Sequence, residues 1–305
     1  MSKKIRSKAL RSQVYHRTIR RIPQIAGSSK VFAKGIRAAC EWALIKGDAA
    51  RCLKLLPDDS IHCTITSPPY YWQRDYGVRG QIGHEDTVEA YVKTLVTTFR
   101  QVRRVLKPNG LLFLVMGDTY YSGKGQPQGW DPKHRSRAVS RMKYRAVDRP
   151  GFGLPKKTLI GVPWRLALAL VSDGWILRSA VTWKKSKPLA EPNARDRPWR
   201  GAELVFIFAR TGRHYFKRNG LSGEEDVWEI DAPSQNGWKH AAPFPEALVE
   251  RCLSCGCSSR GVVLDPFAGS GTTLKVAIAT GRAAIGIDLK ESYIRMAKRR
   301  VNSIR

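Results

Sequence analysis

"VVLDPFAGSGTTLKVAIATGRAAIGIDL", residues 262–289, decides the fold class of this chain. Its first residues are apolar and predict a buried strand over 262–266, and a second apolar run predicts a strand over 283–287. A glycine-containing turn separates the first strand from a helix predicted over 271–280. Such a strand–turn–helix–strand unit binds nucleosides in α/β proteins, because the start of the helix offers free N–H groups.

The residues of the turn indicate the class of ligand. A dinucleotide site has the pattern G-x-G-x-x-G, and here Leu274 occupies the third glycine position, which disfavours close packing around a pyrophosphate. Asp265, just before the turn, would repel a phosphate but attract an ammonium group, and Asp288 is placed to bind ribose hydroxyls. A ligand with a ribose, an ammonium and no phosphate is S-adenosylmethionine. A nicotinamide cofactor, and with it an oxidoreductase, is the alternative.

Outside this unit the chain keeps alternating between predicted strands and helices. The other predicted strands span 42–45, 61–66, 111–116, 176–183 and 203–209, and the other predicted helices span 87–106, 159–172, 245–253 and 291–302. The strands are almost continuously apolar, which indicates an α/β fold whose mostly parallel sheet is covered by helices on both faces. No helix separates 176–183 from 203–209, so this pair is predicted to run antiparallel at one edge.

The charge balance of the chain indicates its partner. There are 54 Lys and Arg residues against 25 Asp and Glu, which gives a net charge of +29 and a pI near 10.3. A balance so far from neutral favours a polyanion, and nucleic acid is the commonest one. A basic protein of membrane surfaces is the alternative, but no run approaches the ~20 apolar residues that span a bilayer. We therefore expect a nucleic-acid partner and no membrane.

Basic residues dominate the start of the chain and two internal segments. Residues 1–40 hold eleven Lys or Arg and no acidic residue, so we expect a basic arm, solvated or disordered, that neutralises phosphates. An organelle transit peptide is the alternative for such a start. Residues 41–305 are predicted to form one folded domain, with basic insertions near 121–157 and 211–238 that are long for loops in a compact domain.

The six cysteines match neither a disulfide framework nor a zinc site. No secretory signal peptide is visible, which favours a reducing compartment. Cys252, Cys255 and Cys257 are close in sequence, but no second C-x-x-C pair and no pair of histidines at zinc spacing follows them. We therefore expect free thiols and no bound metal.

A second informative stretch, "TSPPYY" at residues 66–71, follows the strand predicted over 61–66. Each proline removes a backbone donor and fixes φ, so the strand must end there. A stiff corner that carries a hydroxyl and aromatic rings therefore follows a core strand.

This corner and the glycine turn make the chain resemble the amino-group DNA methyltransferases of the N4-cytosine/N6-adenine type, in the permuted arrangement called β. The family has an S/D-P-P-Y/F corner early and a D-P-F-x-G-S-G-T-T turn late, which correspond to residues 67–70 and 265–273 here. The resemblance extends over about residues 44–302, through segments such as "RRVLKPNGLLFLVMGDTY" at 103–120. It implies a circularly permuted, seven-stranded, Rossmann-like S-adenosylmethionine-dependent methyltransferase fold with one antiparallel strand, in which corner and turn lie side by side.

The resemblance also implies roles for individual residues. The catalytic corner would consist of Ser67, Pro68, Pro69 and Tyr70. In it, the Ser67 hydroxyl and the Pro68 carbonyl would accept hydrogen bonds from the target amino group, while Tyr70 stacks on a base flipped out of the duplex. S-adenosyl-L-methionine would be held by Asp48, Phe244, Pro245, Asp265, Phe267, Gly269, Gly271, Thr272 and Asp288. For Phe244 and Pro245 a hydrophobic staple at a helix start is the alternative.

Recognition of DNA would fall to the basic segments. Residues 121–157 and 211–238 are the candidates for target recognition, and the loop 71–85 would close over the flipped base. The individual residues predicted to contact DNA are Trp72, Arg74, Arg135, Arg137, Arg141, Lys143 and Arg145. A solvated basic surface is the alternative for all of them.

The resulting hypothesis is a site-specific methyltransferase that acts on the exocyclic N4 amino group of cytosine in double-stranded DNA. A serine at the head of the corner, here Ser67, is more typical of N4-cytosine enzymes in this family, whereas aspartate or asparagine is more typical of N6-adenine enzymes. The alternatives are an N6-adenine enzyme of the same fold, an RNA substrate, and a catalytically silent nucleic-acid-binding protein. We expect a prokaryotic or phage-encoded protein of the cytoplasm and nucleoid, monomeric or homodimeric, whose restriction endonuclease is a separate chain or absent.

Overall fold

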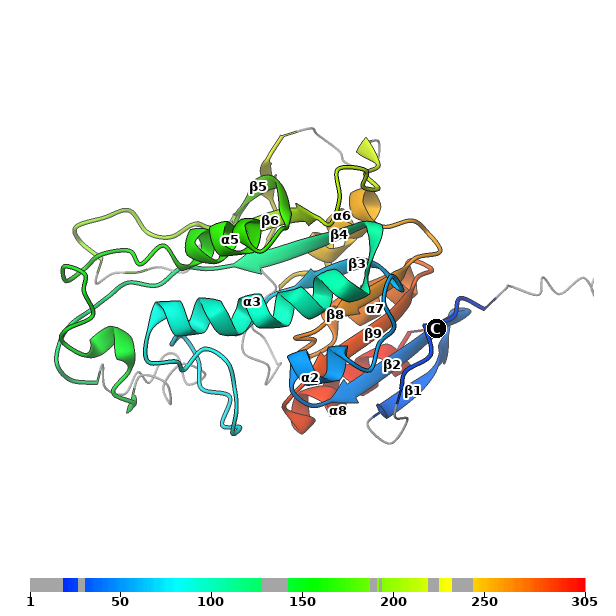
Figure 1. The fold of residues 1–305 in the computed structure, drawn as a ribbon, viewed down its shortest axis with the longest axis horizontal. Helices are drawn as coiled ribbons and strands as arrows, with labels where there is room; N and C mark the ends of the chain where they lie inside the picture. Colours follow the sequence, from blue (N-terminus) through cyan, green and yellow to red (C-terminus); the bar gives the residue numbers. More distant parts are fainter. Residues whose placement is uncertain are drawn as a thin grey trace, which may run out of the picture.

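The computed structural model describes residues 19–26, 31–127, 142–186, 191, 194–218, 225–231 and 244–304. Its described part contains one mixed sheet with the strand order β1-β2-β9-β8-β3-β4-β6-β5-β7 (Figure 1). The strands are β1 (Val31–Arg37), β2 (Cys40–Lys46), β3 (Ile61–Thr66), β4 (Leu106–Met116), β5 (Ile176–Lys184), β6 (Ala202–Ala209), β7 (Val227–Glu229), β8 (Val262–Asp265) and β9 (Ala283–Asp288). The strands from β2 to β4 in this order run parallel, whereas β1 and β6 run antiparallel to their inner neighbours.

Helices cover both faces of the sheet. They are α2 (Ala49–Leu53), α3 (Val88–Val105), α5 (Val162–Ser172), α6 (Glu246–Gly256), α7 (Thr272–Ala279) and α8 (Glu291–Asn302), with a short 3-10 turn, η2, at Ala146–Asp148. The helices α2, α3 and α5 share one apolar cluster, and α6, α7 and α8 share another on the opposite face. This three-layer arrangement is the one that near-continuous apolar strands require.

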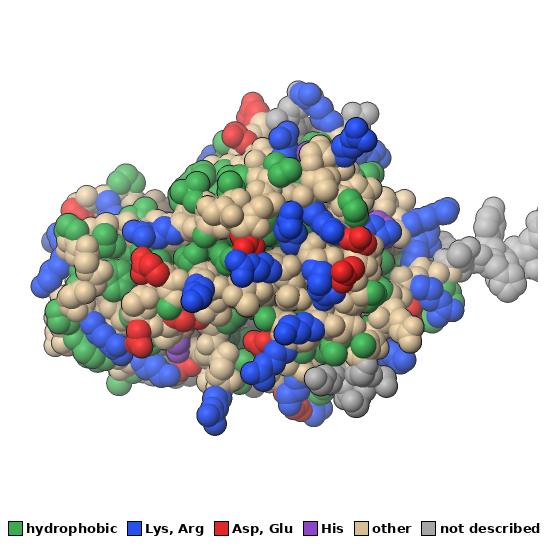
Figure 2. All heavy atoms as spheres, in the orientation of Figure 1, with side chains coloured by type: hydrophobic (Ala, Val, Ile, Leu, Met, Phe, Trp, Pro, Cys, Tyr) green, Lys and Arg blue, Asp and Glu red, His purple; other side chains and the backbone are tan. Residues whose placement is uncertain are grey.

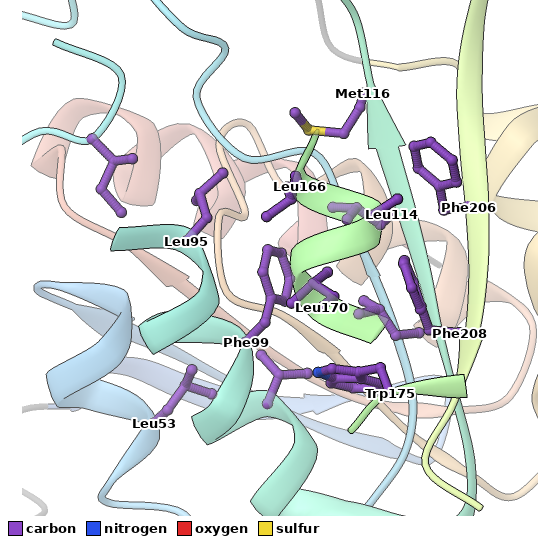
Figure 3. Close-up of a cluster of buried hydrophobic side chains, with 14 of the residues drawn as sticks. Leu53, Leu95, Phe99, Leu114, Met116, Leu166, Leu170, Trp175, Phe206 and Phe208 are labelled. Atoms are coloured by element: carbon purple, nitrogen blue, oxygen red, sulfur yellow. The ribbon is translucent and has the colours of Figure 1, made fainter. Parts of the chain in front are cut away.

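The strand β4 shows how the sequence builds both layers at once. Its residues 112, 114 and 116 point into the cluster beneath α3 and α5, and residues 111, 113 and 115 point into the other cluster. Figure 3 shows the first cluster, where Phe99 and Leu166 from the two helices meet Leu114 of β4 and Phe206 of β6. Each side chain of this kind stabilises the fold by about 1.5–3 kcal/mol when fully buried.

The predicted α/β class, with a mostly parallel sheet, is confirmed. All seven predicted strands are present, and β5 and β6 form the predicted antiparallel pair. The sheet nevertheless has nine strands in the described part of the chain, because β1 and β7 extend it at its two edges. β7 lies inside the segment 211–238 that was predicted to be an insertion, and it covers the outer side of β5.

The start of the chain differs from the prediction. The arm was expected to end at residue 40, yet β1 lies within it and pairs along its length with β2, and Arg20 forms a bridge with Cys40. The sequence of β1, "VFAKGIR", mixes charged residues and a glycine with apolar ones, so its pattern alone does not indicate a strand. β1 forms a strand because it pairs with the buried strand β2, although its own residues do not predict a strand.

The topology places the two informative motifs next to each other. β3, which leads into the proline corner, pairs in parallel with β8, which leads into the glycine turn. β8 in turn pairs in parallel with β9, which ends at Asp288. The carboxyl ends of these adjacent strands therefore lie together, as the permuted arrangement implied.

Within the described residues, no helix combines the length and the apolar character needed to cross a membrane.

Candidate active site

The proline corner is held in place by hydrogen bonds to its backbone. Pro68 is buried, whereas Ser67, Pro69 and Tyr70 are partly exposed. The buried Tyr91 of α3 donates its hydroxyl proton to the Pro69 carbonyl at 2.8 Å. The prolines fix φ, and the bond from Tyr91 holds the Pro69 carbonyl in place. The corner therefore needs no reorganisation to present its hydroxyl and carbonyl groups.

The corner also carries a chain of polar contacts that the sequence did not indicate. Ser67 Oγ donates to the Tyr70 hydroxyl at 3.2 Å, and the Tyr70 hydroxyl donates to Glu203 Oε2 at 2.7 Å. Glu203, near the start of β6, forms an ion pair with Lys185 through its other oxygen. Gly117 leaves the space for the tyrosine, because a Cβ at residue 117 would lie 2.8 Å from the Tyr70 ring.

The corner and the glycine turn are joined by a buried aspartate. Asp265 Oδ1 accepts a hydrogen bond from Thr66 Oγ1 of β3 at 2.7 Å, and Oδ2 accepts one from Thr273 Oγ1 of α7 at 2.7 Å. The Phe267 N–H also donates to Oδ1, at 3.1 Å. Burial is the main cause that raises the pKa of Asp265 to about 6, against the lowering effect of these donors. Asp265 therefore fixes the turn relative to the corner.

A second aspartate holds the other side of the turn. Asp288 Oδ2 accepts from the Gly269 N–H at 2.9 Å, and Oδ1 accepts from the Lys290 N–H at 2.8 Å. Burial also raises the pKa of Asp288 to about 6. Phe267, Gly269 and Asp288 are only partly buried, so they form the accessible part of the turn.

These residues fit a cationic nucleoside. The charge of Asp288 adds to the rise in the pKa of Asp265, so two acidic groups lie close together in this turn. A ligand with a positive charge would relieve this repulsion, whereas a pyrophosphate would increase it. The accessible Asp288 carboxylate also has lone pairs left for ligand hydroxyls.

Other residues of the turn contact the helix α8. Ser270 Oγ and Thr272 Oγ1 accept hydrogen bonds from Arg300 of α8, at 3.1 and 2.9 Å. Gly271 has φ +81°, and a Cβ there would lie 2.7 Å from the Cβ of Ala297. Thr272 and Gly271, both predicted to contact the cofactor, thus contact α8 through their side-chain positions.

Gly271→Ala is expected to destabilise the fold by about 2 kcal/mol or more, because the added methyl clashes with α8 and positive φ strains alanine. Thermal and urea unfolding would measure the loss. Gly212→Ala is the matched control, since nothing lies within 4 Å of its Cβ position. It should stay within about 0.5 kcal/mol of the wild type. Equal stability of the two variants would contradict the packing role of Gly271.

The other residues predicted to bind the cofactor are Asp48, Phe244 and Pro245. Asp48 caps α2 by accepting from the Arg51 N–H at 2.9 Å, and its neighbour Gly47 donates to the Asp288 carbonyl at 2.9 Å. Pro245 immediately precedes α6, and Phe244 packs against the apolar cluster of α6, α7 and α8. This packing agrees with the alternative of a helix-start staple for Phe244 and Pro245.

The loop 71–85 is more tightly packed than its predicted role in DNA contact suggests. The Trp72 ring is buried, stacks on His84 with 4.4 Å between ring centroids, and donates to the Glu85 carbonyl at 2.8 Å. These contacts give Trp72 a structural role, and its contact with DNA stays a prediction. Farther along, the Tyr76 carbonyl accepts from Lys290 Nζ at 2.8 Å, which brings the loop next to the end of β9.

The basic residues predicted to contact DNA fall into three groups. Arg145 is buried in an ion pair with Asp148 at 2.7 Å, so it stabilises the segment before α5. Lys143 pairs with Asp75 at 2.6 Å and remains half-exposed, and Arg74 is partly exposed beside the corner. The other predicted residues, Arg135, Arg137 and Arg141, lie outside the described residues.

All six cysteines are buried and carry free thiols. Within the described ranges, no three His, Cys, Asp or Glu residues are grouped to hold a metal ion.

Comparison with known proteins identifies the family. Residues 61–299 match the profile of the N6/N4 methyltransferases, described as DNA methylase. The chain is a member of this DNA methylase family. It is 41% identical over 270 residues to the Type II methyltransferase M.SmaI of Serratia marcescens, with 85% of this chain and 90% of that protein covered. It is 37% identical over 267 residues to the Type II methyltransferase M.Cfr9I of Citrobacter freundii, with 85% and 87% covered.

Solved structures of DNA methylases share the fold. The PvuII DNA methyltransferase (cytosine-N4-specific) superposes with a TM-score of 0.65 at 21% identity, over 85% of this chain and 86% of that one. A DNA modification methylase of Thermus thermophilus, TTHA0409, complexed with S-adenosyl-L-methionine, superposes with a TM-score of 0.60 at 25% identity, over 86% and 93%. The predicted family and fold are thereby confirmed, and the predicted cofactor is supported.

Proposed function

We propose that this DNA methylase transfers a methyl group from S-adenosyl-L-methionine to the N4 amino group of a cytosine flipped out of duplex DNA. The observation that carries the proposal is the bond from Thr66 to Asp265, because it locks the hydroxyl–Pro–Pro–Tyr corner directly to the glycine turn. A group held by the turn and a base held by the corner would therefore meet at one place.

The turn is the binding site for the methyl donor. Asp288 binds the ribose hydroxyls, and Phe267 and Gly269 line the accessible surface beside it. Asp265 keeps the turn in register with the corner and adds negative charge beneath it. S-adenosyl-L-methionine, when bound, supplies an electrophilic methyl group on a positively charged sulfur.

The corner prepares the nucleophile. An exocyclic amino group is a weak nucleophile, because its lone pair is delocalised into the ring of the base. Ser67 Oγ and the Pro68 carbonyl accept hydrogen bonds from the two N–H groups, which draws the nitrogen toward tetrahedral geometry and frees the lone pair. Because Pro69 is anchored by Tyr91, these acceptors are already in place before the reaction.

The Tyr70 ring provides the surface for the flipped base. It is partly exposed beside Ser67, while its hydroxyl end is fixed by Glu203. Stacking on such a ring is worth about 1–3 kcal/mol per base and does not depend on which base is present. Tyr70 therefore holds the base, and the choice of base is made elsewhere in the pocket.

Cytosine is favoured over adenine by Ser67 at the head of the corner. The fold shared with the cytosine-N4-specific PvuII enzyme is compatible with this assignment. N6-adenine methylation by the same mechanism is the second candidate, because the family contains enzymes of both kinds.

The charge of the surface suits duplex DNA. Lys and Arg side chains are spread over the face that carries α3 and α5, with fewer acidic ones among them (Figure 2). Target recognition falls to the segments 121–157 and 211–238, together with Arg74 and Lys143 beside the corner. The bacterial Type II methyltransferases among its relatives support a Type II modification system. We expect a prokaryotic or phage-encoded protein, any endonuclease on a separate chain, and a methylase that acts as a monomer or homodimer.

The basic arm adds non-specific affinity for phosphates. Removing residues 1–18, which contain six Lys or Arg, should weaken DNA binding and flatten its salt dependence by about 0.9 in slope per lost phosphate contact. Cutting there leaves intact the backbone bonds of Arg20 to Ala39 and Glu41. A full-length chain with those six residues replaced by Gln is the control. Fluorescence anisotropy over a salt series measures the slope, and an unchanged slope would contradict this role of the arm.

The substrate class is tested with tritiated S-adenosyl-L-methionine. Purified protein is incubated with unmethylated genomic DNA, the same DNA denatured, and RNA transcribed from it. We expect incorporation into the duplex at the highest rate. Incorporation into RNA alone would assign the chain another substrate, and incorporation into none of the three would leave a binding protein without activity.

A further inference from the structure

The contacts among Ser67, Tyr70, Glu203 and Lys185 form a continuous chain. It runs from the catalytic hydroxyl at the end of β3 to a carboxylate on β6, two strands away in the sheet. The Glu203 and Lys185 side chains are about one fifth exposed, at 21% and 23%. The Glu203 carboxylate is therefore shielded from water on most sides, and it contacts the corner through the Tyr70 hydroxyl.

The direction of the hydrogen bonds in this chain follows from chemistry. A carboxylate paired with a lysine has no proton to give, so Glu203 can only accept. The Tyr70 hydroxyl has a single proton, which it donates to Glu203 at 2.7 Å. Its oxygen can then only accept from Ser67, at 3.2 Å. The Ser67 proton is thus directed away from the place where the base must bind.

We infer that Glu203 is a positioning residue that sets the polarity of the corner, so that Ser67 presents lone pairs and not its proton to the target amino group. This inference rests on the proposed function. A serine hydroxyl that rotates freely would offer its proton to the nucleophilic nitrogen in part of its population. That hydrogen bond would occupy the lone pair that must attack the methyl group.

Two further features keep the chain in this direction. Burial, with the charge of Glu203 as the second cause, raises the pKa of Tyr70 well above its usual range, so the phenol keeps its proton at neutral pH. The Lys185 ammonium pairs with Glu203 and lies 5.0 Å from the centroid of the Trp183 ring. The ion pair with Lys185 holds the Glu203 carboxylate in the position where it accepts the hydrogen bond from Tyr70.

Two variants interrupt the chain without removing the groups that touch the base. Tyr70→Phe retains the stacking ring, and Glu203→Gln keeps the shape of the side chain but can donate a proton to the tyrosine. Each is expected to lower kcat for methyl transfer by about tenfold, the value of one such hydrogen bond, with KM for DNA and for S-adenosyl-L-methionine within about threefold. Asp173→Asn is the matched control, because Asp173 at the end of α5 pairs with Arg100 at 2.6 Å and lies outside the site.

A double-variant cycle separates positioning from a general structural effect. If Glu203 acts through Ser67, Glu203→Gln should have little further effect in a Ser67→Ala background, so the combined loss stays close to that of Ser67→Ala alone. A combined loss equal to the product of the two single losses would overturn the inference, as would a kcat unchanged in both Tyr70→Phe and Glu203→Gln. Activity of the wild type is measured in the same series, so failure of the proposed function is distinguished by a wild type that methylates no base.

Discussion

Ser67→Ala is expected to lower the single-turnover rate of methyl transfer by about 10²–10³-fold, the usual cost of removing one preorganised group at the reacting centre. The alanine leaves the Pro68 carbonyl as the remaining acceptor, so the amino nitrogen stays closer to its planar, unreactive form. DNA affinity should change little, because Tyr70 and the basic surface still hold the duplex and the base.

The measurement is a rapid-quench time course with enzyme in excess over duplex, which isolates chemistry from product release. Ser60→Ala is the control, because Ser60 precedes the opposite end of β3 and its hydroxyl bonds the Pro57 carbonyl at 2.7 Å. It should leave the rate unchanged. A Ser67→Ala enzyme as fast as the wild type would remove the serine from the mechanism.

Asp288→Asn is expected to weaken binding of S-adenosyl-L-methionine by roughly 10–100-fold, because bonds to a charged acceptor are worth about 1.5–3 kcal/mol. The asparagine keeps one oxygen for the Gly269 or Lys290 N–H but presents an N–H₂ group to the other, and it loses the charge. Glu291→Gln is the control, since it removes a nearby negative charge that bonds Lys46 and Arg295 and not the turn. Isothermal titration calorimetry measures the affinity of each variant for S-adenosyl-L-methionine. An equal loss of affinity in the two variants would show that the negative charge near the turn matters and a direct bond from residue 288 does not.

The pH dependence of this binding follows from the same carboxylate. The folded protein holds the pKa of Asp288 near 6, so protonation begins as the pH falls through that value and removes the charge that attracts the ligand. Affinity for S-adenosyl-L-methionine should therefore be constant above pH 7 and fall by up to about tenfold per pH unit below 6. S-adenosylhomocysteine, which lacks the sulfonium charge, should show a weaker dependence. An affinity flat from pH 5 to 8 would contradict the electrostatic role of Asp288.

Sequence reasoning predicted the fold well where the strands are buried. The apolar runs at β3, β8 and β9 are short, bounded by turns and free of helical periodicity, so both their type and their parallel direction could be predicted. β1 was not predicted, because an edge strand buries only one face and tolerates charged residues and glycine. β7 has three residues, too few for a periodic pattern, and the buried side chain of Trp228 holds it against the sheet.

The proximity of the corner and the turn was predicted because their residues belong to local motifs at strand ends. Ser67, Asp265 and Asp288 each stand at the end of a predicted parallel strand, and a sheet brings such ends together. Glu203 was not predicted, because it stands at the beginning of a strand. Since β6 runs antiparallel, its beginning lies at the same edge as the carboxyl ends of its neighbours. An acidic residue at the start of a predicted antiparallel strand is the signal that could have revealed it.

The residues predicted to contact DNA show the limit of composition as a guide. A count of Lys and Arg does not distinguish a side chain that faces solvent from one that stabilises the fold. Arg145 is buried against Asp148, whereas Lys143, two residues earlier, is half-exposed. The contacts of each side chain in the folded protein distinguish Arg145 from Lys143.

The identity of the methylated nucleoside tests the proposed function most directly. Unmethylated genomic DNA is incubated with the purified chain and S-adenosyl-L-methionine labelled in its methyl group, digested to nucleosides and analysed by mass spectrometry. We expect labelled N4-methylcytosine. Labelled N6-methyladenine would contradict the assignment of cytosine from Ser67, and the absence of any labelled base would contradict methyl transfer to DNA.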